Sequence, residues 1–255
     1  MRKSVLHHTI IDNMLILLKV GAFGVSFDGD LIQMSPSKWR KLASSAEHLG
    51  ILPYIADGFN ALEGRKYLSP ALADILLSKS DIIDNQRNRK YDYSKAKLFN
   101  FYTSQRWEGV VNEETSGTDI SEETLNLLDV IIAVLDDMIT KDIDILGVIT
   151  LGLYIRQHRD KIDYQKLNRW LTHIGLVQVA SLEGNILINC FDFKSAELPF
   201  VIKEDEKSYD IIYDVIENTF VGHSFNNSTR LNIAMLETVS YQFMKAISHI
   251  TDIEE

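Results

Sequence analysis

The sequence predicts an all-α fold, a multi-helix array with little or no sheet. Apolar residues recur at spacings of three and four in several stretches, which is typical of amphipathic helices. Helix start and stop signals bracket many of these stretches. No convincing run of alternating apolar and polar residues, the mark of a half-buried strand, occurs. With 255 residues, of which 45% are hydrophobic and 24% charged, the chain can bury a sizeable core in one domain or in two packed halves.

The first stretch, residues 1–25, begins with Arg2 and Lys3 and then turns apolar. Polar residues interrupt it, so it lacks the continuous apolar run of a signal peptide, and we predict a mature N-terminal helix. Gly21 and Gly24 lie near its end without the strand and helix that surround a phosphate-binding loop. We interpret both glycines as helix C-caps.

Two Ser-Pro pairs, at residues 35–36 and 69–70, mark the next helix starts. Each pair places an N-cap before a proline at the first helical position. The first of these helices is expected to stop at Gly50. The second has no internal glycine or proline, and we predict that its helical stretch continues to about Phe101.

A polar segment, residues 107–120, is the best candidate for a connection between two halves. It includes two glycines and lacks apolar periodicity, so we predict a flexible linker. The linker divides the chain into an N-terminal helical half, residues 1–106, and a C-terminal helical half, residues 121–255. The two halves can also pack as one domain.

The C-terminal half is predicted to contain six helices. Capping residues at their ends or apolar residues at helical spacing indicate them. The most apolar run, residues 145–155, falls well short of the roughly 20 residues that span a bilayer, so we expect no membrane segment. The predicted helices cover residues 121–140, 145–155, 163–175, 176–191, 209–219 and 230–250.

The formal net charge of −10 repels nucleic-acid backbones and anionic lipids unless positive charge gathers locally. Cys190 is the only cysteine, so the chain can form neither an intramolecular disulfide nor a cysteine-rich metal site. This fits a reducing compartment, and we expect a cytoplasmic location. We interpret Cys190 as a small buried hydrophobe.

One segment does gather positive charge, with tyrosines between its basic residues. Such a mixture can bind RNA or DNA. On a long helix it is more often a solvated face, and that is the interpretation we favour. The candidate nucleic-acid residues are Arg87, Arg89, Lys90, Lys95 and Lys97.

Asp142 and Asp144 are the candidates for catalysis. On a strand, two carboxylates one residue apart point to the same face and can bind Mg²⁺ for nucleotidyl transfer. Such a site also needs a phosphate-cradling loop and usually a third carboxylate, and neither is evident here. We therefore favour a polar break or an N-cap between two buried helices.

The seven histidines show no spacing with cysteine or glutamate that matches a zinc site, and we predict no metal ligands. His7 and His8 are adjacent, so they point in different directions on a helix. Surface or capping roles fit the histidines better.

The leading and trailing parts of the chain each hold a group of patterned segments. The leading group is LILLKVGAFG at 15–24, Trp39 in its capped helix and LGILPYIADGFN at 49–60. The trailing group is GLYIRQHRDKIDYQKL at 152–167, HIGL at 173–176 and ELPF at 197–200. Together they resemble the helical N- and C-terminal flanks of an uncharacterised nucleotidyltransferase-like family common in Bacteroidetes.

The resemblance implies a sheet-based core between these flanks, with a glycine-containing loop and paired carboxylates that hold a divalent metal beside a nucleoside triphosphate. Residues 101–142 are too few for such a core, and we expect a linker and one helix there. The resemblance therefore implies bacterial helical flanks from which the catalytic core is missing.

These observations predict a non-catalytic helical interaction or regulatory protein whose partner is another protein. One alternative is a divergent metal-dependent nucleotidyltransferase that uses Asp142, Asp144 and Mg²⁺. A second alternative is nucleic-acid binding through residues 87–97. No cofactor is expected outside the enzyme alternative, and the sequence leaves the oligomeric state open.

Overall fold

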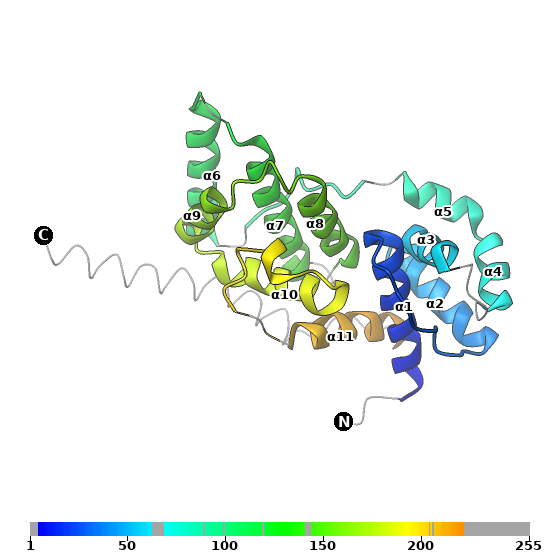
Figure 1. Cartoon of the computed structure of the whole chain (residues 1–255). Helices are drawn as coiled ribbons and strands as arrows, with labels where there is room; N and C mark the ends of the chain where they lie inside the picture. The colour runs from blue at the N-terminus through cyan, green and yellow to red at the C-terminus, as the bar shows by residue number, and fades with distance from the viewer. Residues whose placement is uncertain are drawn as a thin grey trace, which may run out of the picture. The chain divides into compact units, whose positions relative to one another are not determined.

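The prediction of an all-α fold is confirmed (Figure 1). In the computed structural model, the part of the chain that is described forms eleven α-helices and one short 3₁₀ helix and contains no strand. The described residues are 5–62, 69–88, 90–98, 100–118, 120–140, 144–203, 205 and 207–221. The helices are α1 Val5–Phe23, α2 Pro36–His48, α3 Leu52–Leu62, α4 Pro70–Leu77, α5 Ser80–Arg87, α6 Phe101–Ser116, α7 Glu122–Thr140, α8 Ile145–Gln157, α9 Tyr164–Ile174, α10 Val177–Phe191, η1 Ser195–Glu197 and α11 Lys207–Val221.

The contacts between elements divide the chain into two compact units. Unit 1 holds α1 to α5 and most of α11, and unit 2 holds α6 to α9 and most of α10. Among the described residues, unit 1 comprises 5–62, 69–88, 90–91, 189–192 and 209–221, and unit 2 comprises 92–98, 100–118, 120–140, 144–188, 193–203, 205 and 207–208.

Several helix ends lie where the capping residues predicted them. Ser35 precedes Pro36 at the start of α2, and its hydroxyl accepts a hydrogen bond from the Lys38 N–H. Asp163 caps α9 in the same way, and Gly175 ends that helix in the left-handed region with φ of 93°. Each cap depends on residues only a few positions apart, so it can be predicted from the sequence. The predicted helix over 230–250 lies outside the described residues.

The prediction of one helical stretch from residue 69 to about Phe101 is wrong. The structure has α4 and α5 there, followed by a non-helical segment at 90–98. The Ser78 hydroxyl donates to the Ile75 carbonyl at the end of α4, and the Asn88 amide donates to the Asp84 carbonyl at the end of α5. Such local side-chain bonds to the backbone compete with the continuation of a helix.

The segment predicted as a linker, residues 107–120, is mostly helix, because α6 extends from Phe101 to Ser116. Gly109 lies in its interior and is exposed, which a helix tolerates at a cost of about 1 kcal/mol. The polarity of this stretch reflects a solvated helix face and not a flexible connection. Whether residues 1–106 and 121–255 fold as separate halves stays a prediction.

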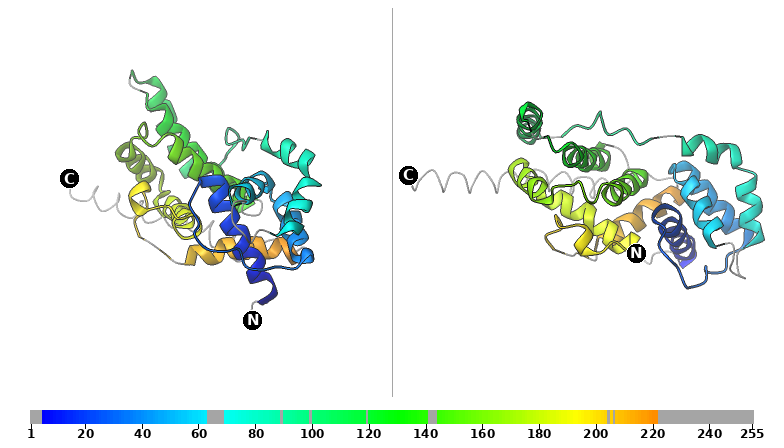
Figure 2. Two further views of the ribbon diagram at one scale, coloured as in Figure 1. Left: turned by 45° about the vertical axis from the view of Figure 1, so that its right-hand side comes forward. Right: turned by 45° about the horizontal axis from the view of Figure 1, so that its top comes forward.

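In unit 1, α1, α2 and α3 lie side by side (Figures 1 and 2). The backbones of α1 and α3 approach closely because Gly21 and Gly58 face each other's helix. A Cβ atom on Gly21 would collide with the Tyr54 carbonyl, and one on Gly58 would collide with the Leu17 carbonyl. The C-cap interpretation of Gly21 is therefore wrong, whereas Gly24 does follow the end of α1 with a φ of 63°.

In unit 2, α7 packs against α8 and α9, and α6 packs against α9 (Figure 2). The middle of α7, residues 127–135, is buried except for Asp129, which is half-buried. This matches its apolar residues, which leave only a narrow polar line along the helix. The arrangement brings the end of α6, the start of α7 and the start of α9 together, and a polar cluster forms there.

Candidate functional site

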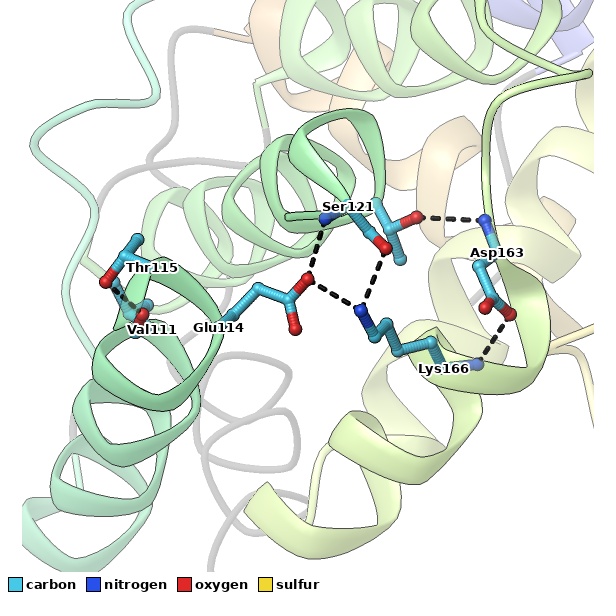
Figure 3. Close-up of polar contacts among 7 residues, drawn as sticks. Val111, Glu114, Thr115, Ser121, Asp163 and Lys166 are labelled. Atoms are coloured by element: carbon cyan, nitrogen blue, oxygen red, sulfur yellow. Dashed lines mark hydrogen bonds and ion pairs between the residues drawn. The ribbon is translucent and has the colours of Figure 1, made fainter. Parts of the chain in front are cut away.

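The polar cluster of unit 2 consists of Glu114 on α6, Ser121 directly before α7 and Lys166 on α9 (Figure 3). The Lys166 Nζ lies 2.7 Å from Glu114 Oε1 and 2.9 Å from Ser121 Oγ. The Ser121 backbone N–H donates to the same Glu114 oxygen at 2.7 Å. Glu114 Oε1 therefore accepts two hydrogen bonds, one from Lys166 on α9 and one from the residue directly before α7.

Burial and hydrogen bonding act in opposite directions on Glu114. Its side chain is only 10% exposed and that of Lys166 is 21% exposed. Burial acts to raise the pKa of Glu114, but the hydrogen bonds from Lys166 and Ser121 outweigh it and lower that pKa below the ordinary 4.5. Glu114 is thus an ionised carboxylate at neutral pH, held by an ammonium ion.

A second group of bonds links the cluster to the start of α9. Asp163 Oδ1 accepts from the Lys166 backbone N–H at 2.9 Å, which caps the helix. The Asp163 N–H donates in turn to the hydroxyl of Thr124, a fully buried residue of α7. Figure 3 also draws the Thr115 hydroxyl on the Val111 carbonyl one turn away within α6. The cluster therefore ties three helices to one another.

The pairing of Ser121 with Lys166 has the residue types of a nucleophile and a base, but its geometry gives a different role. A catalytic lysine must be neutral to take a proton from serine. Glu114 Oε1 lies 2.7 Å from the Lys166 Nζ, and the carboxylate compensates the charge of the lysine. The Lys166 Nζ donates to Ser121 Oγ instead of accepting its proton, so the cluster joins helices.

Asp144, one of the two predicted catalytic residues, is the N-cap of α8. Its carboxylate accepts a hydrogen bond from the Leu146 N–H at 2.9 Å. This confirms the N-cap interpretation for Asp144, and it contradicts the strand that the metal-binding alternative requires at this residue. Asp142 lies outside the described residues.

The basic segment does not lie on a single helix, so the interpretation of a solvated helical face is wrong. Arg87 ends α5, and both terminal nitrogens of its guanidinium donate hydrogen bonds to the Asp57 carboxylate, at 2.8 and 2.9 Å. Lys90 is exposed, and Arg89 lies outside the described residues. Arg87 and Lys90 belong to unit 1.

The remaining basic candidates, Lys95 and Lys97, are exposed in the non-helical part of unit 2. Lys95 Nζ lies 3.2 Å from an Asp92 carboxylate oxygen, so its charge is partly compensated. The Lys97 backbone N–H donates to Asp136. The structure therefore gives these two lysines acidic neighbours and not a shared basic face.

Metal binding finds no support in the part of the chain that the structure describes, where no group of three or more His, Cys, Asp or Glu residues could hold a metal ion. His8 packs its ring on Tyr213 of α11, with centroids 4.9 Å apart. Cys190 is buried, as predicted, and burial raises the pKa of its thiol to about 12. The thiol is therefore protonated and unreactive at neutral pH.

A cluster of ionisable groups joins α1 and α11 within unit 1. Burial raises the pKa of Asp12, while the charge of His8 and a hydrogen bond from the Tyr209 hydroxyl act to lower it. His8 and Asp12 are four residues apart on α1, and Tyr209 and Tyr213 are four apart on α11, so each pair occupies one helix face.

In two further acidic residues of unit 2, burial raises the pKa of the side-chain carboxyl group. Asp129 on α7 accepts a hydrogen bond from the Trp107 indole at 3.2 Å, and burial raises its pKa to about 6. Glu183 on α10 is fully buried, and neither of its carboxyl oxygens has a hydrogen-bond partner among the described residues. Burial raises the pKa of Glu183 well above its ordinary value, so the neutral acid is favoured.

Sequence reasoning missed Glu114, Lys166, Asp129 and Glu183. Glu114 and Lys166 are 52 residues apart, and no local pattern links them. Glu183 gave a signal that could have been used, because it lies three or four residues from the apolar Val179, Ala180 and Leu187 and so shares their helix face. The hydrogen bond that Asp129 accepts joins it to Trp107, 22 residues earlier, and no local pattern links these two residues.

Comparison with known proteins gave no match to a family model, to a curated protein or to a solved structure. Within the described residues, no helix has the length and apolar character needed to cross a membrane.

Proposed function

We propose that this chain is a non-catalytic helical protein that binds another protein. One observation carries the proposal: Phe101 and Tyr102, neighbours in the first turn of α6, expose 67% and 54% of their surface. Their rings contact each other edge to face with centroids 5.8 Å apart. Exposed aromatic side chains are enriched at protein interfaces, where they supply much of the binding energy.

The charge of the chain supports a protein partner over a nucleic acid. A net charge of −10 repels phosphate backbones. Arg87 and Lys95, two of the basic candidates, have carboxylates as partners. Descent from the flanks of a nucleotidyltransferase-like protein and a cytoplasmic location, consistent with the single cysteine, are part of the same proposal.

Affinity capture with a matched pair of variants tests the proposal. The test variant is Phe101→Ala with Tyr102→Ala, and the control is Gln105→Ala with Glu108→Ala, two exposed polar residues of the same helix. Proteins captured from cell extract are quantified by mass spectrometry, and the partner is then purified and its affinity measured. We expect one protein that binds the wild type and the control alike and binds the aromatic variant at least about tenfold more weakly.

The nucleotidyltransferase alternative is tested on the same purified protein by thermal unfolding. The unfolding temperature is measured with ATP, CTP, GTP and UTP, each with and without Mg²⁺. The wild type is compared with a double variant, Asp142→Asn with Asp144→Asn. A nucleotide shift that needs Mg²⁺ and is lost in the double variant would replace our proposal with the nucleotidyltransferase alternative. Equal capture by wild type and aromatic variant would refute the proposed surface.

A further inference from the structure

The helix α6 lies at the edge of unit 2 and buries few of its own residues (Figures 1 and 2). Of its 16 residues, Thr103, Val110 and Glu114 are buried, and Glu114 binds Lys166 of α9. At about 3.6 residues per turn, the exposed residues of α6 occupy one continuous face, which we call the outer face. The outer face consists of Phe101, Tyr102, Gln105, Glu108, Gly109, Asn112, Glu113, Thr115 and Ser116.

Gly109 lies on the outer face, and no contact in the described part of the chain requires a glycine there. Outside its own helix, no described heavy atom would lie within 4 Å of a Cβ atom at this position. A glycine inside a helix costs about 1 kcal/mol relative to alanine. In unit 1, by contrast, Gly21 and Gly58 let the backbones of α1 and α3 approach closely. Gly109 offers the same close approach to a helix from another molecule.

Tyr102, Gly109 and Ser116 form a line along the outer face, because they are seven residues apart. A spacing of seven keeps positions directed at one helix that packs alongside. The line has an aromatic side chain at its start and small residues at Gly109 and Ser116, where the larger side chains of a partner helix can pack. Phe101 contacts the Tyr102 ring edge to face and enlarges the aromatic end.

The outer face is acidic. Glu108 and Glu113 lie on opposite sides of the line through Gly109, and neither carboxylate has an ion pair among the described residues. Arg106, the cation of α6, donates to the His173 carbonyl at 2.9 Å. Anionic lipids, nucleic acids and a second copy of this chain would all bring negative charge to this face. The charge therefore favours a basic partner.

We propose that the outer face of α6 binds a basic amphipathic helix of another protein, which crosses α6 at Gly109 and places lysine or arginine beside Glu108 and Glu113. Binding of this kind specifies the partner of the proposed function, on which it rests. The apolar side of the partner helix contacts Phe101 and Tyr102. Aromatic anchors then supply most of the affinity, and the charged residues at the rim select the partner.

Selection from a displayed library of helical peptides tests the proposal. The peptides are about three heptads long, vary alanine, leucine and phenylalanine along one side, and carry either lysine or glutamate at the positions that flank it. Pools selected on the purified protein are sequenced, and the affinity of selected peptides is measured by fluorescence anisotropy. We expect the wild type to enrich lysine over glutamate at least about threefold.

Charge reversal separates this surface from the general attraction of a basic peptide to an acidic protein. In Glu108→Lys with Glu113→Lys, we expect the preference to change to glutamate. The control, Asp74→Lys with Asp160→Lys, changes the net charge equally at exposed acids outside α6 and should keep the preference for lysine. Truncation of Glu108 to alanine removes only a contact at the rim and should change the affinity less than about threefold.

A leucine at Gly109 tests the crossing point. The space around Gly109 is open in the chain by itself, so Gly109→Leu should unfold at the wild-type temperature or above it. The selected peptides should bind this variant at least about tenfold more weakly, because the leucine occupies the space of the partner helix. The control is Thr115→Leu at the edge of the outer face, which should bind these peptides as the wild type does.

Three results would overturn the proposal: no peptide selected by the wild type, a lysine preference that survives reversal of Glu108 and Glu113, or unchanged peptide binding by Gly109→Leu. A dimer in sedimentation that Gly109→Leu abolishes would assign the outer face to a second copy instead. Loss of capture in the variant of Phe101 and Tyr102, with no lysine preference in the selection, would overturn the basic helix and leave the proposed function. Equal capture with a lysine preference would do the reverse.

Discussion

Two buried glutamates in unit 2 differ in their hydrogen-bond donors and in the direction in which their pKa is shifted. Glu114 and Glu183 both lie on helices and are both less than about a tenth exposed. Glu114 has an ammonium ion, a backbone N–H and a lowered pKa, whereas Glu183 has no hydrogen-bond partner among the described residues and a raised pKa. Burial alone therefore does not decide the charge of an acid in this fold, because the donors around it decide whether desolvation is compensated.

The largest expected effect comes from removing the cation that compensates Glu114. Lys166→Met should lower the free energy of unfolding by about 3 kcal/mol, because it leaves a nearly buried carboxylate without its partner. Urea denaturation at pH 7 measures this change. The control is Lys161→Met, which breaks an ion pair of similar length with a lysine that is 66% exposed, and it should have little effect. Equal losses in the two variants would contradict the comparison.

Replacing the second glutamate should act in the opposite direction. Glu183→Gln is expected to stabilise the protein by about 2 kcal/mol at pH 8, because it removes an ionisable group that burial disfavours in its charged form. A raised folded-state pKa means that the wild type is relatively stable at low pH and loses stability as pH rises through that pKa. The gain in the variant should therefore shrink at pH 5.

Thermal unfolding at the two pH values checks this result for Glu183. The exposed Glu113 provides the control, and Glu113→Gln should give the same unfolding temperature as the wild type at both pH values. A destabilised Glu183→Gln at pH 8 would show that the carboxylate is held by a partner after all.

A smaller effect is expected when Glu114 itself loses its charge. Glu114→Gln should cost about 1.5 kcal/mol at pH 7, because a neutral acceptor binds the Lys166 ammonium less strongly than a carboxylate does. The lowered folded-state pKa of Glu114 stabilises the wild type above 4.5, and this stabilisation is lost as pH falls. The stabilities of wild type and variant should therefore converge as pH falls below the lowered pKa of Glu114, and a constant difference would speak against an ionised Glu114.

The smallest expected effect concerns Asp144, whose carboxylate accepts from the backbone N–H of Leu146. Asp144→Ala should cost about 1 kcal/mol, because it removes the N-cap of α8, whereas Asp144→Asn should cost almost nothing. Thermal unfolding of both variants measures the difference. Equal destabilisation by alanine and asparagine would show that the charge of Asp144 matters beyond the cap.

The parts of this fold that depend on residues close together in the sequence could be predicted from it. Ser35, Asp144 and Asp163 cap helices by binding an N–H two or three residues away. Ser35 was predicted from the proline that follows it, Asp144 as an N-cap between two buried helices, and Asp163 as the first residue of the predicted helix over 163–175. The break between α4 and α5 was missed because serine in that stretch binds the backbone of the preceding turn, a choice that composition does not fix.

The polar cluster could not be predicted, for a related reason. Glu114 belongs to a segment that its glycines and polar residues identified as a linker, and Lys166 is one of several lysines in the C-terminal half. Their partnership depends on how α6 and α9 pack, and this packing involves few of the apolar residues on which sequence patterns rest. The exposed pair Phe101 and Tyr102 gave no signal either, since aromatic residues are ordinarily expected inside.

The crossing of α1 and α3 at Gly21 and Gly58 fixes the register of these two helices. Sliding one helix by a single turn would place a side chain where only a hydrogen atom fits, against the carbonyl of Tyr54 or of Leu17. In a library covering every substitution in unit 1, these two positions should therefore reject even alanine, while neighbouring solvent-facing positions accept most residues.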